Sequence, residues 1–156
     1  MDKVRGFEIA KGWEDKDIHL PKRSTKYSAG YDFEVAEEVT VPSFKPGIAP
    51  TLVKTGIKAY MMDDEMLCLY NRSSNPKKKG IVLANSVGII DKDYYGNEDN
   101  DGHIMFAIWN FKDEEIKLKK GEKIGQGIFQ KYLVADDDEN TVENNLRGGG
   151  FGSTDK

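Results

Sequence analysis

Apolar and alternating runs recur along the chain, and turn-forming residues separate them. Most runs span five to eight residues, are rich in β-branched and aromatic residues, and are bounded by Gly, Pro, Asn or Asp. They read EEVTVPSF, TLVKTGIKAY, EMLCLYN, GIVLAN, HIMFAIWNF, EIKLKKG and KIGQGIFQKYLV. No window keeps the apolar period of about 3.6 residues that an amphipathic helix needs. The pattern predicts an all-β fold, a barrel or sandwich of many short strands, with one helical turn after Ser74.

The chain divides into a β-rich part and a polar extension. With 156 residues it can bury one core, and its sixteen glycines suit tight turns better than helices. Residues 1–133 hold the apolar runs and are predicted to form one β-barrel domain. Residues 134–156 comprise an acidic connector, VADDDENTVENN, and a flexible glycine-rich arm, RGGGFGSTDK. Another acidic stretch, GNEDNDGH at residues 96–103 (the acidic loop), is interpreted as solvated.

Composition excludes several classes of partner and site. The net charge of −4 argues against binding to a nucleic-acid polymer, because phosphate backbones are held by clustered Lys and Arg. No stretch approaches the ~20 apolar residues of a membrane span, and the N-terminus has no signal-peptide pattern, so a cytoplasmic location is expected. Cys68, inside the run MLCLY, is interpreted as a buried structural thiol. His19 and His103 are isolated, so no zinc-site spacing is present.

The stretch ANSVGIIDKDYYGN, residues 84–97, carries the densest candidate chemistry. Its composition predicts a β-hairpin. One interpretation is a carboxylate, Asp91, held at a pocket wall beside the ring of Tyr94. The alternative is a polar turn whose aspartates, Asp91 and Asp93, are solvated.

Three further stretches present polar groups between strands. In NRSSNPKKKG, Arg72, Ser73 and Ser74 offer a guanidinium, two hydroxyls and backbone N–H groups to one anion, although a solvated polar loop remains an alternative. In SAGYDFEVAEE, a bend at the glycine presents the carboxylate of Asp32. In GEKIGQGIFQ, Gln126 lies within an apolar strand pattern and must find partners, either structural ones or a ligand.

Taken in order, five stretches resemble the five signature motifs of the trimeric dUTPases (deoxyuridine triphosphatases). They are AGYDFEVA, NRSSNPKKKG, NSVGIIDKDYYGN, GEKIGQGIFQ and RGGGFGST. The resemblance implies a jelly-roll-like β-barrel assembled as a homotrimer, in agreement with the all-β prediction. It also implies hydrolysis of dUTP to dUMP and pyrophosphate with Mg²⁺ on the triphosphate. Each active site is then expected at a subunit interface, closed by the C-terminal arm of another protomer.

The resemblance assigns roles around the nucleoside. Asp91 matches the catalytic aspartate that orients and deprotonates the attacking water. Tyr94 matches the ring that packs under the deoxyribose and excludes a 2′-hydroxyl by a clash. Asn85 matches the asparagine that reads the uracil edge. The backbone that completes this reading belongs to Gly88, Ile89 and Ile90.

The resemblance also assigns phosphate and metal contacts. Arg72, Ser73 and Ser74 match the triphosphate-binding motif, and Gln126 matches another phosphate contact. Asp32 matches an aspartate near the metal-bound waters, so we expect it to act on Mg²⁺ through water.

The arm is expected to contact the substrate at both ends. Arg147 matches the arginine that reaches the γ-phosphate, and Phe151 matches the ring that stacks over uracil. Further phosphate contacts are expected from Gly152, Ser153 and Thr154. The sequence departs from the family in three places. One residue fewer separates Arg147 from Phe151, the insertion at residues 97–102 has no assigned role, and the connector is long and acidic.

Two alternatives to a dUTPase are considered. A dCTP deaminase shares this fold but needs a glutamate three residues before an Asn, and Ala107 stands at that position in IMFAIWN. A non-catalytic dUTP-binding regulatory module would use the same pocket. Asp91 argues against pure binding, because a negative charge beside phosphates does not help to hold them.

Overall fold

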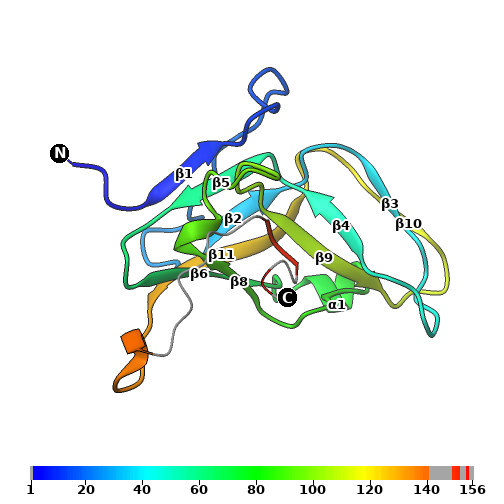
Figure 1. Ribbon diagram of the computed structural model, residues 1–156. Coiled ribbons are helices and arrows are strands. Elements are labelled where there is room, and N and C mark those ends of the chain that lie inside the picture. Colours follow the sequence, from blue (N-terminus) through cyan, green and yellow to red (C-terminus); the bar gives the residue numbers. More distant parts are fainter. Residues whose placement is uncertain (1, 141–148, 152–153, 155–156) are drawn as a thin grey trace.

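Short strands are the main regular elements of the described residues (Figure 1). The computed structural model describes residues 2–140, 149–151 and 154. The strands are β1 (Gly6–Ile9), β2 (Tyr31–Glu34), β3 (Val39–Val41), β4 (Thr51–Lys54), β5 (Ile57–Tyr60), β6 (Glu65–Tyr70), β7 (Ile81–Leu83), β8 (Gly88–Asp91), β9 (Met105–Asn110), β10 (Ile116–Leu118) and β11 (Lys123–Lys131). The helical elements are α1 (Asn75–Lys78) and the 3₁₀ turns η1 (Lys92–Tyr94) and η2 (Asp138–Asn140).

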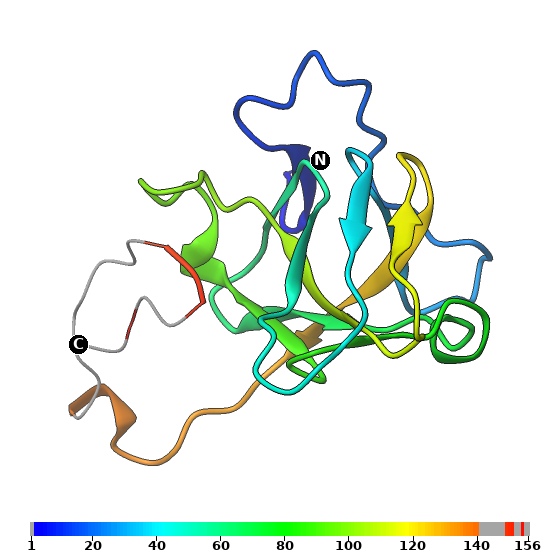
Figure 2. The same cartoon turned by 90° about the vertical axis from the view of Figure 1, so that its right-hand side faces the viewer.

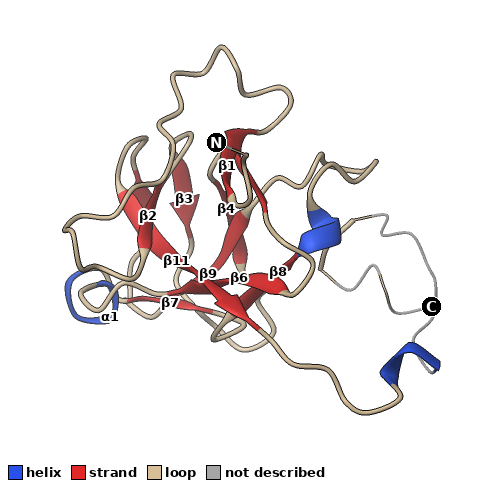
Figure 3. Cartoon of the chain, turned by 90° about the vertical axis from the view of Figure 1, so that its left-hand side faces the viewer, coloured by secondary structure: helices blue, strands red, loops and turns tan. Residues whose placement is uncertain are grey.

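The described strands form four antiparallel sheets around one core. The sheets have the orders β2-β11-β6-β8, β4-β9-β7, β1-β5 and β10-β3. Figure 3 shows these strands gathered in one body, and Figure 2 shows η2, in orange, lying away from it. This arrangement agrees with the prediction of an all-β, jelly-roll-like fold. No helix in the described part of the chain is long and apolar enough to span a bilayer.

Apolar and polar side chains alternate along the strands, so that one apolar face points to the core. In β5, for example, Ile57 and Ala59 are buried while their neighbours are half-buried. The rings of Phe33 and Phe106 are fully buried and meet edge to face with centroids 5.4 Å apart. Cys68 is buried, as predicted.

Two glycines of β11 allow these rings to approach the backbone. A methyl group at Gly125 would overlap the ring of Phe106, and one at Gly127 would lie 2.9 Å from Cε1 of Phe33. The sequence GQG therefore reflects packing under the strand, with Gln126 directed to the other face.

The predicted helical turn after Ser74 is present as α1. Asn75 is buried at its start, and its Nδ2 donates to Oδ1 of Asn71 at 2.8 Å and to the carbonyl of Ile124 at 2.9 Å. Ser74 stands at the N-cap position without a side-chain cap hydrogen bond. The buried amide thus ties the turn that carries Arg72 to the end of β6 and to β11.

Candidate active site

A pocket forms around the end of β8 and the turn that precedes it. It is lined by Leu69, Asn85, Gly88, Ile89, Ile90, Asp91, Tyr94, Met105, Gly150 and Phe151. Seven predicted site residues are therefore brought together, six from one sequence stretch and Phe151 from the arm. Asp91 is exposed at the end of β8, whereas Tyr94 in η1 is buried. The structure thus places a carboxylate beside an aromatic ring at a pocket wall.

The strands that flank Asn85 do not form the predicted β-hairpin. β7 pairs with β9, whereas β8 pairs with β6 in a different sheet. The intervening turn is closed by a hydrogen bond from the Val87 amide to the Asn85 carbonyl at 2.7 Å, and Ser86 has a φ of 58°. The hairpin prediction is wrong because sheet membership depends on distant strands, which local turn residues do not reveal.

A glycine stands where β8 begins, close to the neighbouring strand. A methyl group at Gly88 would lie 3.1 Å from Cβ of Leu69 on the neighbouring strand β6. The backbone of β8 is therefore held closely against β6. This places its peptide groups at the pocket wall without a side chain at residue 88.

The residues predicted to contact phosphate and metal, apart from those of the arm, form a second group. Arg72 and Ser73 follow β6, and Gln126 in β11 pairs across the sheet with Asp32 of β2. Nε2 of Gln126 donates to the carbonyl of Asn71 at 3.2 Å, next to the Arg72 turn. A methyl group at Gly30 would overlap the Gln126 side chain, so this glycine makes room for the amide.

Asp32 already has a cationic neighbour. Its Oδ2 lies 3.3 Å from Nζ of Lys123, and its side chain is 17% exposed. Both residues line a second pocket, together with His19, Leu20, Lys22, Ser24 and Glu34. Among the described residues, no cluster of three or more His, Cys, Asp or Glu side chains is arranged to hold a metal ion.

The two groups lie at opposite ends of β6. Asp91 pairs with Met66 near the start of this strand, whereas Arg72 follows its other end. A strand of six residues spans roughly 17 Å, so Asp91 and Arg72 of one chain are too far apart to hold the same phosphate group.

Residues 16–155 match the model of the dUTPase family. The chain belongs to the dUTPase family. The deoxyuridine 5′-triphosphate nucleotidohydrolase of Lactococcus lactis subsp. lactis is 56% identical over 152 residues, which cover 97% of this chain and 98% of that protein. The enzyme of the same name from Acinetobacter baumannii is 35% identical over 144 residues, 90% of this chain and 91% of that protein.

Solved structures of dUTPases have the same fold. The dUTPase from Streptococcus mutans superposes with a TM-score of 0.78 at 47% identity, covering 84% of this chain and 98% of that one. A mutant dUTPase from phage phi11 of S. aureus, which coordinates a structural Mg(II) ion, has a TM-score of 0.68 at 18% identity, over 86% of this chain and 94% of that one. At this identity the phage protein is a likeness of fold alone.

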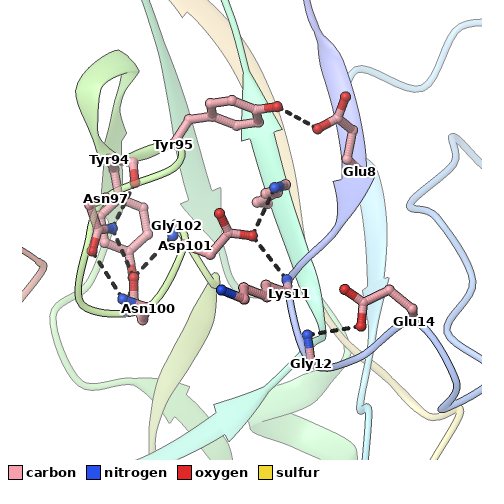
Figure 4. A network of polar contacts seen from close by, with 11 residues as sticks. Glu8, Lys11, Gly12, Glu14, Tyr94, Tyr95, Asn97, Asn100, Asp101 and Gly102 are labelled. Atoms are coloured by element: carbon pink, nitrogen blue, oxygen red, sulfur yellow. Dashed lines mark hydrogen bonds and ion pairs between the residues drawn. The ribbon is translucent and has the colours of Figure 1, made fainter.

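In this member of the dUTPase family, the acidic loop is built into the structure. Asn97 and His103 are buried, and the Asp101 carboxylate Oδ2 accepts from the Lys11 amide at 2.9 Å and from Nζ of Lys58 at 2.8 Å (Figure 4). Burial raises the pKa of Asp101, but these hydrogen bonds outweigh it and hold that pKa below its usual range. The prediction of a solvated loop is wrong for these residues, because asparagine and aspartate side chains bond to nearby backbone and cations.

His103 closes the loop against the body of the protein. Its Nε2 accepts from the Gly56 amide at 2.8 Å, and its ring lies 5.2 Å from that of Trp13. Burial and the charge of Lys54 lower the pKa of His103 to about 4, so the ring is neutral at pH 7.

The Tyr94 hydroxyl makes two hydrogen bonds that sequence reasoning missed. Its hydroxyl donates to the His103 carbonyl at 2.6 Å and accepts from Nδ2 of Asn100 at 2.8 Å. The only available signal was the Asn, Asp and Gly content of the loop, which indicates turns but not their partner.

The arm meets the same pocket. A methyl group at Gly150 would lie 2.9 Å from Cε1 of Tyr94, and one at Gly149 would lie 3.0 Å from Oδ2 of Asp99. In the single chain, Gly149 and Gly150 lie against the pocket of the same chain. The resemblance implies instead that the arm of another protomer closes over each pocket. Thr154 is exposed. The predicted contacts of Arg147, Gly152 and Ser153 lie outside the described residues.

Proposed function

We propose that this protein hydrolyses dUTP to dUMP and pyrophosphate, and that Asp91 orients and deprotonates the attacking water. The observation that carries the proposal is the pocket, which gathers Asp91 with the predicted base-reading and sugar-packing residues. The chain surrounding this pocket is 56% identical to a deoxyuridine 5′-triphosphate nucleotidohydrolase. The exposed end of β8 leaves the carboxylate accessible to water, and an ionised carboxylate accepts hydrogen bonds.

The wall of the pocket is suited to reading a base and a sugar. The backbone of β8 near Gly88 and the side chain of Asn85 offer donors and acceptors to the pairing edge of uracil. A wrong base leaves one of these groups unpaired, which costs about 1–3 kcal/mol. The ring of Tyr94 then lies under the sugar, where a 2′-hydroxyl has no room.

In the proposed reaction, the water oxygen bonds to the α-phosphorus, and the bond from that phosphorus to the oxygen bridging the α- and β-phosphates breaks. Asp91 takes the proton of the water, and pyrophosphate leaves. Bound Mg²⁺ would neutralise charge on the triphosphate. The residues fit a metal held mainly by phosphates, since Asp32 is the carboxylate of the second group and would reach the ion through water.

We infer that the two groups of residues act on one substrate only when they come from different protomers. Asp91 and Arg72 of one chain are separated by the length of β6, so we expect a neighbouring copy to supply the second group. This supports the proposed homotrimer with active sites at subunit interfaces. Ser74 fits a phosphate contact because its hydroxyl does not cap α1.

Residues 134–156 are proposed to act as a separate arm. β11 ends at Lys131, and Gly150 and Phe151 line the pocket. The ring of Phe151 is 61% exposed, so it has apolar surface left for a stacked uracil.

A deaminase reaction is not supported at the corresponding strand. Ala107 is buried in β9, and its carbonyl accepts from the Ala84 amide at 2.8 Å. Its methyl side chain has no acid or base group.

The test is a nucleotide panel with and without Mg²⁺. The protein should release pyrophosphate from dUTP with Mg²⁺ and turn over UTP, dTTP and dCTP poorly. Asp91→Asn should bind dUTP and reduce kcat by at least about 100-fold, the lower range for a general base. Calorimetric binding of dUTP without turnover by the wild type would instead indicate a regulatory module, and wild-type rates for Asp91→Asn would remove this residue from its role.

A further inference from the structure

Resting on the proposed function, we propose that Asn100, within the insertion, is a positioning residue that fixes the Tyr94 ring and thereby sets discrimination against ribonucleotides. The acidic loop begins two residues after Tyr94 and returns to its hydroxyl (Figure 4). An exclusion by steric clash works only if the ring cannot move aside. The question is therefore what prevents Tyr94 from moving.

The hydroxyl of Tyr94 is held from two sides. It donates to the His103 carbonyl at 2.6 Å and accepts from Nδ2 of Asn100 at 2.8 Å. Tyr94 is 5% exposed as a whole residue, although it lines the pocket. Moving the ring would break both hydrogen bonds inside a largely buried environment, which is costly.

Asn100 is itself held in place. Its Oδ1 accepts from Nδ2 of Asn97 at 2.8 Å and from the Gly102 amide at 3.0 Å. Oδ1 of Asn97 accepts from the amides of Asp99 and Asn100, at 3.0 and 3.1 Å. Nδ2 of Asn97 also donates to the Tyr94 carbonyl at 2.7 Å, so the network joins both ends of this tyrosine.

The loop packs closely against the residues that it supports. Asp101 and Gly102 have φ values of 62° and 89°, the left-handed region that favours glycine. A methyl group at Gly102 would lie 2.8 Å from the Tyr94 carbonyl oxygen. The ion pair of Asp101 with Lys58 then ties the loop to β5. The support is therefore anchored independently of the pocket.

The sharpest variant is Asn100→Asp. It keeps an oxygen to accept from the Gly102 amide but replaces the donor to the Tyr94 hydroxyl with an acceptor. The hydroxyl has one proton, so it can no longer bond to both residue 100 and the His103 carbonyl. The ratio of kcat/KM for dUTP to that for UTP should fall roughly fivefold to tenfold, the factor expected for one hydrogen bond. Tyr94→Phe, which keeps the ring and removes the hydroxyl, should lower the ratio similarly.

A double-mutant comparison distinguishes positioning of the Tyr94 ring from a general loss of loop structure. If Asn100 acts through the hydroxyl, Asn100→Asp should have little further effect on the ratio in the Tyr94→Phe protein. Glu98→Gln is the control, because Glu98 is exposed in the same loop and its ratio should equal that of the wild type. Adding Glu98→Gln to Asn100→Asp restores the loop's charge and should leave the loss in place.

The outcomes are distinguishable. If the wild type does not hydrolyse dUTP, the proposed function fails. If the wild type hydrolyses dUTP, two results would refute only the role of Asn100. One is an unchanged dUTP-to-UTP ratio of kcat/KM in Asn100→Asp. The other is an equal fall in that ratio when Asn100→Asp is made in the wild type and in the Tyr94→Phe protein. If Asn100→Asp does not fold, the Tyr94→Phe protein provides the test. An unchanged dUTP-to-UTP ratio of kcat/KM in Tyr94→Phe would overturn the proposal.

Discussion

At the scale of single residues, the contact of Gly150 with Tyr94 limits what the arm tolerates. Gly150→Ala would place a methyl group 2.9 Å from a ring that the acidic loop holds in place. We expect kcat/KM for dUTP to fall roughly tenfold, equivalent to about 1.4 kcal/mol of lost closure. Gly149→Ala should cost less, because its methyl group would meet the Asp99 carboxylate, which can rotate away. Equal steady-state losses for the two variants would contradict this account.

The buried His103 predicts how stability depends on pH. Its pKa is lowered to about 4 in the folded protein, against an ordinary value of 6.5. Below the ordinary value the unfolded chain takes up a proton that the folded ring does not, so the stabilisation present above pH 6.5 is lost as pH falls towards 4. The slope from this group reaches about 1.4 kcal/mol per pH unit.

The measurement is urea unfolding at pH 7.5 and pH 5 for the wild type and His103→Gln. The glutamine keeps an acceptor for the Gly56 amide and does not titrate. We expect the variant to lose less free energy of unfolding than the wild type between these two pH values. Equal losses would show that His103 is not the titrating group.

The grouping of candidate site residues was predictable where those residues are close in sequence. Asn85, Asp91 and Tyr94 fall within one stretch, so their assembly in one pocket needed only a turn and a strand. The role of Asn100 was not predictable, because an Asn in a polar loop bonds to solvent or backbone with equal ease. The buried Tyr94 residue determines which partner Asn100 bonds to, and the burial of Tyr94 depends on the rest of the fold.

At the scale of elements, strand positions were more predictable than strand partners. The run TLVKTGIKAY contains β4 and β5, which belong to different sheets. They separate at Gly56, which has a φ of 72° and packs under Ile18. β1 and β2, with the sequences GFEI and YDFE, lie outside the predicted apolar runs. The apolar pattern thus indicated extended segments, whereas their partners were decided by packing between distant parts of the chain.

At the scale of the whole molecule, the arm and the pocket raise the question of exchange between protomers. Gly150 and Phe151 line the pocket of their own chain. Identical protomers can exchange such an element with no change in the contacts that it makes. The resemblance to trimeric dUTPases predicts this exchange, and the separation of Asp91 from Arg72 along β6 supports the proposal that a second chain completes each site.

Hybrid trimers test the exchange directly. One parent carries Asp91→Asn with its arm intact, and the other keeps Asp91 but ends at residue 146. Each parent alone should be nearly inactive. After mixing and reassembly, an exchanged arm can close over an intact pocket, so we expect roughly a tenth or more of wild-type turnover of dUTP to return, given the high effective concentration within an assembly. No recovery in mixed trimers confirmed by mass would show that each arm closes on its own chain, as Gly150 does against Tyr94 here.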